Sequence, residues 1–304
     1  MIPSSPFWLT SSNPGSVIID RFNSFLENIT ITPQQYEEGL TKCRGIISTL
    51  NNYYNNISSV EGALLVGSWG KKTNIRPISD IDLLFTVPYD VYQRFERRLG
   101  NKQSQLLQEV KGVLSSPYPN TAIKGDRNVV VVDFSFCKVE VIPAFVTSSG
   151  QFLICDAAGN GTYKMAAPLA EINMVDRFDN SNQKTRNLIK MIKCWKRHRN
   201  VPLKSFFIEL ISIDFLVEWP HRNNGPIFYD WMIRDFFAFL KNRANSHVQV
   251  PGTNEIIPLG NEWLPAANRA HEWANAACQN ESKYPTLAGE EWQKIFGDYI
   301  PRVV

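Results

Sequence analysis

The 304-residue sequence lacks the features of several classes of protein. Its five cysteines are scattered, without the close spacing of metal ligands or of a disulfide framework, so we expect reduced thiols and a cytoplasmic location. No apolar stretch reaches the length of a membrane span, and residues 1–5 lack the basic start of a signal peptide. The 32 basic and 29 acidic residues leave a net charge of +3, too small to predict a surface that coats nucleic acid. These absences leave a soluble globular protein of one or two domains.

Two neighbouring motifs carry the strongest chemical signal that is present. Residues 64–70 read LLVGSWG, and residues 79–84 read SDIDLL. In a strand, residues two apart point to the same face, so Asp80 and Asp82 would project side by side and favour a cation between them. Mg²⁺ is usually held by one or two carboxylates together with substrate phosphates.

The glycine and serine of the first motif point to the phosphates themselves. Gly67 lets the backbone approach a ligand closely, and Ser68 can begin a helical turn whose N–H groups face an anion. Either motif alone is weak, because most Asp-x-Asp pairs lie on solvated loops. Together they predict a phosphate cradle beside a metal-binding pair.

The order of strand, Gly-Ser and Asp-x-Asp resembles the nucleotidyltransferase superfamily that includes polymerase beta. Catalysis of that type needs a third carboxylate on a neighbouring strand. Residues 129–134 and 138–145 predict a β-hairpin, which offers Asp133 and Glu140. Glu140 lies between two valines, an expensive place for an unpaired charge, whereas Asp133 could be satisfied at a wet edge. We favour Glu140 and keep Asp133 as the alternative.

Basic residues at two further places could hold a polyphosphate. A loop over residues 71–76 contains Lys71, Lys72, Thr73 and Arg76. A predicted helix over residues 185–200 has an apolar face and a separate basic stripe, formed by Arg186, Lys190, Lys193 and Arg197. A solvated surface is the usual explanation of such a stripe, but here a second helix follows, with Ser205 in its first turn.

The remaining pattern predicts mostly helices. Amphipathic periodicity indicates helices over residues 14–28, 33–55, 90–115 and 229–241. Residues 152–178 are rich in glycine, asparagine and alanine and predict a connector.

At this point the motifs resemble one family, the bacterial cGAS/DncV-like nucleotidyltransferases, also called second-messenger oligonucleotide or dinucleotide synthetases. Gly67-Ser68 with Thr73 and Asp80-Ile81-Asp82 matches the family's catalytic motif. Residues 139–143 match its third-carboxylate strand, which more often carries Asp than the Glu found here. Residues 188–195 resemble its Lys-x-Trp helix, residues 203–209 the motif whose serine contacts phosphate, and residues 291–301 its closing segment.

The resemblance implies an α+β fold: a polymerase-beta-like core with a mixed central sheet, a helical C-terminal lobe, and the active site in the cleft between them. We place the core at residues 1–165 and the lobe at 166–304. It implies Asp80, Asp82 and Glu140 as the catalytic and metal-binding residues, with Mg²⁺, or Mn²⁺ in its place, as cofactor. It also implies a set of nucleotide-binding residues: Gly67, Ser68, Thr73, Lys190, Lys193 and Ser205.

The implied activity is the joining of nucleoside triphosphates into a cyclic di- or trinucleotide signal for anti-phage defence, with release of pyrophosphate. We expect a monomer that needs neither nucleic acid nor membrane, and whose regulation falls to a partner protein or to nucleotide access. Two alternatives stay open: a template-free enzyme that extends the 3′ ends of RNA, and a catalytically dead nucleotide or RNA sensor.

Overall fold

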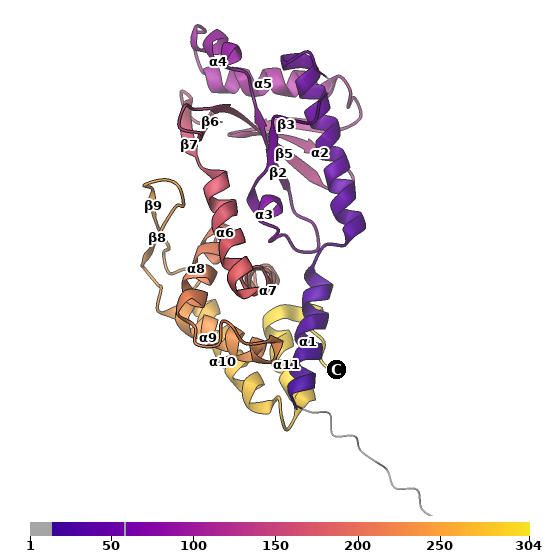
Figure 1. Cartoon of the computed structure of the whole chain (residues 1–304), viewed down its shortest axis with the longest axis vertical. Helices are drawn as coiled ribbons and strands as arrows, with labels where there is room; N and C mark the ends of the chain where they lie inside the picture. The colour runs from indigo at the N-terminus through magenta and orange to yellow at the C-terminus, as the bar shows by residue number, and fades with distance from the viewer. Residues whose placement is uncertain (1–13, 58) are drawn as a thin grey trace, which may run out of the picture. The chain divides into compact units, whose positions relative to one another are not determined.

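A computed structural model describes residues 14–57 and 59–304 of the chain, and the residues 1–5 considered above lie outside this part. The chain divides into two compact units (Figure 1). The sheet unit comprises residues 30–186 and 247–257, and the described part of the helical unit comprises residues 14–29, 187–246 and 258–304.

These boundaries differ from the predicted division at residue 165. Helix α1 (Pro14–Ile29) belongs to the helical unit, because its aromatic side chains pack there. Helix α6 (Pro168–Asn182) belongs to the sheet unit, as does most of a small hairpin formed by β8 (His247–Gln249) and β9 (Ile256–Pro258). Sequence position alone could not reveal this, because each unit is assembled from separated segments.

The sheet unit is built on one mixed, seven-stranded sheet. Its strands are β1 (Ala63–Leu65), β2 (Ile81–Thr86), β3 (Ala122–Asp126), β4 (Val129–Asp133), β5 (Lys138–Val146), β6 (Phe152–Asp156) and β7 (Thr162–Ala166). Strands β2 and β5 run parallel, and every other neighbouring pair is antiparallel. The predicted mixed sheet and the hairpin of β4 and β5 are confirmed. The predicted connector over residues 152–178 is wrong, because β6, β7 and most of α6 occupy it.

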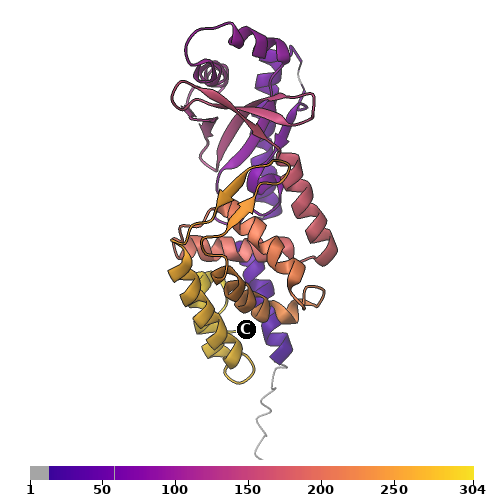
Figure 2. The same ribbon diagram turned by 90° about the vertical axis from the view of Figure 1, so that its left-hand side faces the viewer.

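One face of this sheet is covered by two long helices, α2 (Pro33–Tyr54) and α5 (Lys102–Ser115), and in Figure 2 α2 runs behind the strands. Alternate residues of the central strands point into this core, where Ile81, Leu83 and Val141 are almost fully buried. Helix α2 begins at a capping box between Thr32 and Gln35 and carries its buried positions along one side. The predicted helix over residues 90–115 is two helices, α4 (Tyr89–Glu96) and α5.

The helical unit contains α1, most of α7 (Thr185–His198), and α8 (Ser205–Glu218), α9 (Tyr229–Lys241), α10 (Leu264–Asn280) and α11 (Pro285–Phe296). Its core joins α1 to α11 through aromatic pairs, with the ring centroids of Phe22 and Trp292 5.3 Å apart and those of Phe25 and Phe296 4.6 Å apart.

One buried arginine ties the ends of this unit together. Arg21 is fully buried in α1, and its guanidinium forms an ion pair with Glu281 at 3.1 Å. The same guanidinium donates hydrogen bonds to the carbonyl oxygens of Pro285, Pro301 and Arg302. Because a buried charge is tolerated only when it is paired and hydrogen-bonded, Arg21 fixes the final residues of the chain against its first described helix.

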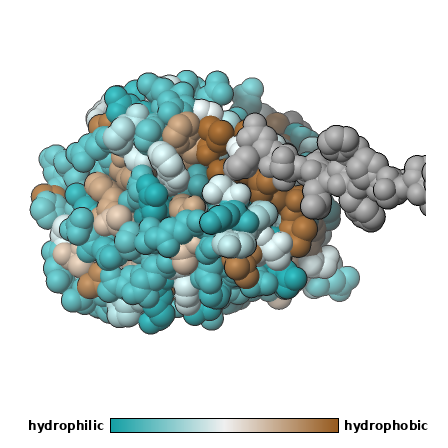
Figure 3. All heavy atoms as spheres, turned by 90° about the horizontal axis from the view of Figure 1, so that it is seen from below, coloured by the Kyte–Doolittle hydropathy of each residue, from teal (hydrophilic) through white to brown (hydrophobic). Residues whose placement is uncertain are grey.

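No helix within residues 14–57 and 59–304 is long and apolar enough to span a membrane. The face of the molecule drawn in Figure 3 is mostly hydrophilic, with hydrophobic residues gathered in a few separate areas.

Candidate active site

The parallel pairing of β2 and β5 places two of the predicted carboxylates side by side. Asp82 and Glu140 are partners in the register of the two strands, so their side chains share one face of the sheet. Both are half-buried. Each lies between residues that point into the opposite core, such as Val139 and Val141 around Glu140. The alternation of the strands therefore delivers these carboxylates to the face that α2 and α5 do not cover.

The electrostatics of Glu140 reflect this placement. Burial raises the pKa of Glu140, and the negative charges of Asp82 and Asp80 raise it further. Asp80 directly precedes the first residue of β2 and is half-buried as well. Three acidic side chains thus act on one another, an arrangement that a bound cation would stabilise.

The Gly-Ser motif lies directly against these carboxylates. It forms the one-turn helix α3 (Gly67–Gly70), and Gly67 has a left-handed φ of 56°. A Cβ atom at Gly67 would come within 1.9 Å of Oδ2 of Asp82, so only glycine allows this approach. The backbone of Val66 also donates to the carbonyl oxygen of Asp82 at 3.0 Å. The predicted closeness of the Gly-Ser turn and the acidic strand is present in the structure.

Asp133, the alternative third carboxylate, lies elsewhere in the sheet. It is the register partner of Lys138, and the two side chains form an ion pair at 3.4 Å. The Asp133 side chain is 43% exposed, and the neighbour of Asp82 on β5 is Glu140. This geometry favours Glu140 as the third carboxylate.

The donor set fits a hard divalent cation. Carboxylate oxygens on a water-accessible face are the protein ligands that Mg²⁺ uses together with phosphates and water. Within the described residues, no three His, Cys, Asp or Glu side chains form a ready-made metal site.

The basic loop after the Gly-Ser turn is less available than its composition indicated. Lys71 is buried, and its ammonium forms an ion pair with Glu171 at 2.8 Å. Thr73 is fully buried, and its backbone N–H donates to the carbonyl oxygen of Ser68 at 2.9 Å. This favours a role for Thr73 in shaping the loop over direct contact with a nucleotide.

The basic stripe of α7 is also partly occupied by partners within the protein. The apolar face predicted for this helix is fully buried, at Leu188, Ile189, Ile192 and Trp195. Lys193 forms a buried ion pair with Glu209 of α8 at 2.6 Å, with 7% and 4% of the two side chains exposed. Arg186 contacts Asp176 and Asp179, while Lys190 is half-buried.

A lysine outside the predicted set contacts the predicted serine. The ammonium of Lys196 donates a hydrogen bond to the Ser205 hydroxyl at 3.1 Å, at the first residue of α8. Burial lowers the pKa of Lys196. Lys196 was not among the predicted site residues, because it lies three residues beyond Lys193, outside the stripe.

Comparisons with known proteins identify the family of the chain. Residues 17–178 match the model of the Second Messenger Oligonucleotide or Dinucleotide Synthetase domain. A probable cyclic nucleotide synthase of Bacillus cereus (strain VD146) is 27% identical, over 77% of this chain and 81% of that protein. The CBASS oligonucleotide cyclase CdnC of Escherichia coli (strain KTE188) is 24% identical, over 66% of this chain and 64% of its own length.

Solved structures show the same fold. The structure of E. coli MS115-1 CdnC in complex with HORMA-deltaN superposes with a TM-score of 0.67 at 17% identity, covering 93% of this chain and 97% of that one. The 3′-deoxy GTP-bound form of E. coli DncV gives a TM-score of 0.70 at 11% identity, covering 90% and 93% of the two chains. The predicted fold class is thereby confirmed.

Proposed function

The chain belongs to the Second Messenger Oligonucleotide or Dinucleotide Synthetase family of nucleotidyltransferases, and from this we propose that it joins nucleoside triphosphates into a cyclic di- or trinucleotide. The observation that carries the proposal is the pairing of Asp82 with Glu140 on parallel strands. Gly67 lies directly against this pair, since a Cβ atom there would come within 1.9 Å of Oδ2 of Asp82. We place the product in CBASS-type anti-phage signalling, because relatives of this chain bear the names cyclic nucleotide synthase and CBASS oligonucleotide cyclase.

In the proposed reaction, a ribose hydroxyl of one nucleotide attacks the α-phosphorus of another, the bond to pyrophosphate breaks, and repetition of the step closes the ring. Glu140 accepts the proton of the attacking hydroxyl, directly or through water, and Asp82 and Asp80 would hold the cation. A divalent ion such as Mg²⁺ would stabilise the charge that develops on the attacking and leaving oxygens. The Gly67–Ser68 turn binds the phosphates through its backbone.

We propose a second set of phosphate contacts on α7 and α8. Ser205 keeps its predicted role, and Lys196 joins it, because its ammonium already contacts the Ser205 hydroxyl. Lys193 is less suited to carry the charge, since Glu209 neutralises it in a buried pair. Direct contact of Lys190 with a phosphate stays a prediction.

Assays of the purified protein test the activity. Nuclease-treated protein is incubated with the four labelled ribonucleoside triphosphates and MgCl₂, and the products are treated with phosphatase. A cyclic product has no terminal phosphate, so we expect a labelled species that resists phosphatase and forms without added RNA. A parallel reaction contains added RNA. Extension of that RNA, with no cyclic product, would support the RNA nucleotidyltransferase, and no nucleotide transfer in either reaction would support the dead sensor.

The same assay tests independence from nucleic acid. Binding to a duplex rests chiefly on neutralisation of phosphates by Lys and Arg, and the net charge here is +3. We therefore expect duplexes of increasing length to change the rate little. Strong stimulation by any duplex would contradict this and would shift attention from a regulatory partner protein to nucleic acid.

Binding measurements test Lys196. Lys196→Ala removes a charge-assisted contact that contributes about 1.5–3 kcal/mol. Calorimetry should show nucleoside triphosphate binding weakened by roughly tenfold to a hundredfold. Lys241→Ala is the matched control, because Lys241 lies in the same unit and contacts His271 instead. Equal affinities for the Lys196 and Lys241 variants would remove Lys196 from the site.

A further inference from the structure

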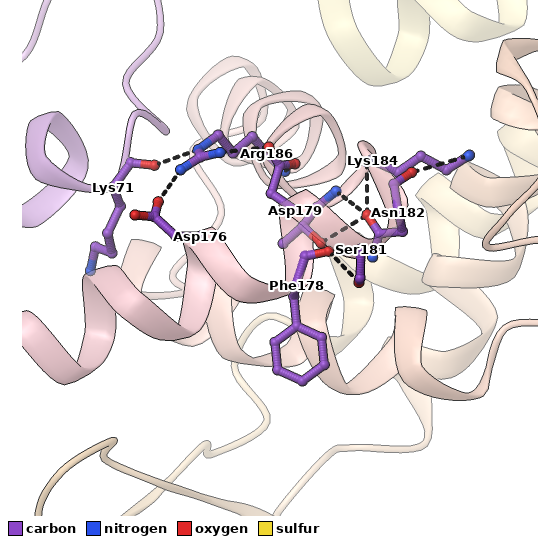
Figure 4. Close-up of polar contacts among 9 residues, drawn as sticks. Lys71, Asp176, Phe178, Asp179, Ser181, Asn182, Lys184 and Arg186 are labelled. Atoms are coloured by element: carbon purple, nitrogen blue, oxygen red, sulfur yellow. Dashed lines mark hydrogen bonds and ion pairs between the residues drawn. The ribbon is translucent and has the colours of Figure 1, made fainter.

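Arg186 is held in one orientation by two aspartates of the preceding helix (Figure 4). Its Nη1 donates to Oδ2 of Asp179 at 2.6 Å, and its Nη2 contacts Oδ1 of Asp176. Only 17% of the Arg186 side chain is exposed. The planar guanidinium suits such a two-sided grip, which leaves its Nε free to point in a third, fixed direction.

The corner between α6 and α7 fixes the backbone of Arg186 as well. Gln183 adopts a left-handed conformation and ends α6, and Asn182 accepts hydrogen bonds from the backbone N–H groups of Lys184 and Thr185. The backbone N–H of Arg186 donates to Oδ1 of Asp179 at 2.9 Å. Backbone N–H groups at the start of α7 are thus paired with acceptors of α6.

In its third direction the guanidinium reaches the end of the Gly67–Ser68 turn. Nε of Arg186 donates to the backbone carbonyl oxygen of Lys71 at 3.0 Å. Lys71 is the C-cap of α3, the turn that contains Gly67 and Ser68. The last carbonyls of a helix lack partners within it, and basic side chains commonly supply them. Arg186 therefore caps the far end of the turn whose near end faces Asp82.

Two further contacts from α6 reach the same end of the turn. Glu171 pairs with the ammonium of Lys71 at 2.8 Å, so this residue is gripped by its side chain and by its carbonyl. A Cβ atom at Gly70 would lie 3.0 Å from Cδ1 of Ile172 and 2.3 Å from the carbonyl oxygen of Leu65, so α6 packs closely there.

The turn transmits such a grip because it is internally closed. The backbone N–H groups of Gly70, Lys71 and Thr73 donate to the carbonyl oxygens of Val66, Gly67 and Ser68, respectively. A displacement of Lys71 must therefore move Gly67, and Gly67 lies against the Asp82 carboxylate.

From this chain of contacts we propose that Arg186 is a positioning residue: together with Glu171 it sets the place of the Gly67–Ser68 turn relative to Asp82 and so determines turnover. The inference rests on the proposed function for its effect on the reaction. Arg186 does not serve as a phosphate ligand here, because two carboxylates already neutralise its charge. Arg186, the first residue of the basic stripe, thus acts through the loop.

Arg186→Lys tests the proposal, because lysine keeps the charge beside the two aspartates but cannot also present a fixed third donor. Arg94→Lys is the matched control: Arg94 makes a two-bond contact with Glu109 between α4 and α5 of the same unit, at 2.8 and 2.6 Å. We expect kcat of Arg186→Lys to fall by about 100-fold, as displacement of catalytic groups by about 1 Å can cause, with a smaller change in KM. Melting temperatures should fall alike in both variants.

Hydrogen exchange gives a readout that does not depend on activity. Amides of residues 67–73 should exchange roughly tenfold faster in Arg186→Lys than in wild type, whereas amides of β4 should not change. Equal exchange over residues 67–73, or faster exchange with an unchanged kcat, would overturn the proposal. A loss of kcat that Arg94→Lys shares would also overturn it, since the effect would then be one of general stability.

The proposal can still be tested if Arg186→Lys does not fold or if the protein shows no activity. If Arg186→Lys does not fold, Glu171→Gln decides by the same measurements, because it removes the other grip on Lys71. If wild-type protein makes no product from any nucleoside triphosphate, the proposed function fails, while the exchange comparison still decides whether Arg186 holds the loop.

Discussion

The two faces of the central sheet carry opposite kinds of side chain, although both are made by the same strands. On one face, Leu83 and Val141 lie in a dry core beneath α2 and α5. On the other, their sequence neighbours Asp82 and Glu140 lie side by side and half-buried. The small apolar cluster on this second face includes Leu84, one pleat further along β2. A strand of period two can therefore anchor itself and present chemistry with adjacent residues.

Because one face carries the carboxylates and the other the apolar core, we expect mutations on the first to change activity and mutations on the second to change stability. The largest effect is expected at Asp82. Asp82→Asn keeps the shape of the side chain but removes its charge, so we expect activity to fall roughly 1000-fold, or about 4 kcal/mol in the barrier. Circular dichroism and thermal melting should remain those of the wild type. Normal product yield from folded Asp82→Asn would break the assignment of this face to catalysis.

Glu140 should show the next largest effect. A general base contributes about 100-fold or more, so Glu140→Gln should lower turnover by at least that factor while the sheet stays intact. Product formation under saturating nucleoside triphosphates measures this. If Asp133→Asn were the more damaging of the two changes, with both proteins folded, the third carboxylate would have to be reassigned.

Mutations on the opposite face should lower stability and leave the activity of the folded protein unchanged. Leu83 is 1% exposed in the core, and Leu83→Ala should destabilise the protein by about 3 kcal/mol through lost burial and the cavity left behind. Urea unfolding measures the change, and activity per folded molecule should be preserved at low temperature. Loss of activity without loss of stability would show that the two faces are not independent.

Asp133 sharpens the comparison with the smallest expected effect. Its ion pair with Lys138 is exposed, and such pairs contribute at most about 1 kcal/mol. Asp133→Asn should therefore change both stability and turnover little. A measurable fall in turnover at unchanged stability would extend the reactive face to the end of β4.

The sequence predicted the strands that carry Asp82 and Glu140, because that information is local, but it did not predict β6 and β7. An aspartate pair at strand spacing and a glutamate between valines report their own faces, and the parallel register then brings Asp82 and Glu140 together. Turn geometry was also visible, in Gly67 before Ser68.

The partners of the basic residues were not visible, because charge periodicity does not say which carboxylate a lysine meets. Lys193 finds Glu209 and Lys196 finds Ser205 only when α7 and α8 fold against each other. Arg186 is an exception, since Asp179 lies seven residues before it and Asp176 ten, a spacing that could have been noticed.

The long sequence separation between α1 and its partners has a consequence for synthesis. Arg21 leaves the ribosome early, but Glu281, Pro285 and Pro301, which it binds, are made last. Contacts so distant along the chain form slowly, whereas the contiguous residues 30–186 of the sheet unit can fold while translation continues. The apolar side of α1 packs on Tyr229 through Phe22 and is completed only by α11, which Phe22 and Phe25 both contact. The nascent protein can therefore form its central strands before it can close the helical unit, and the apolar side of α1 is incompletely covered until the chain is finished.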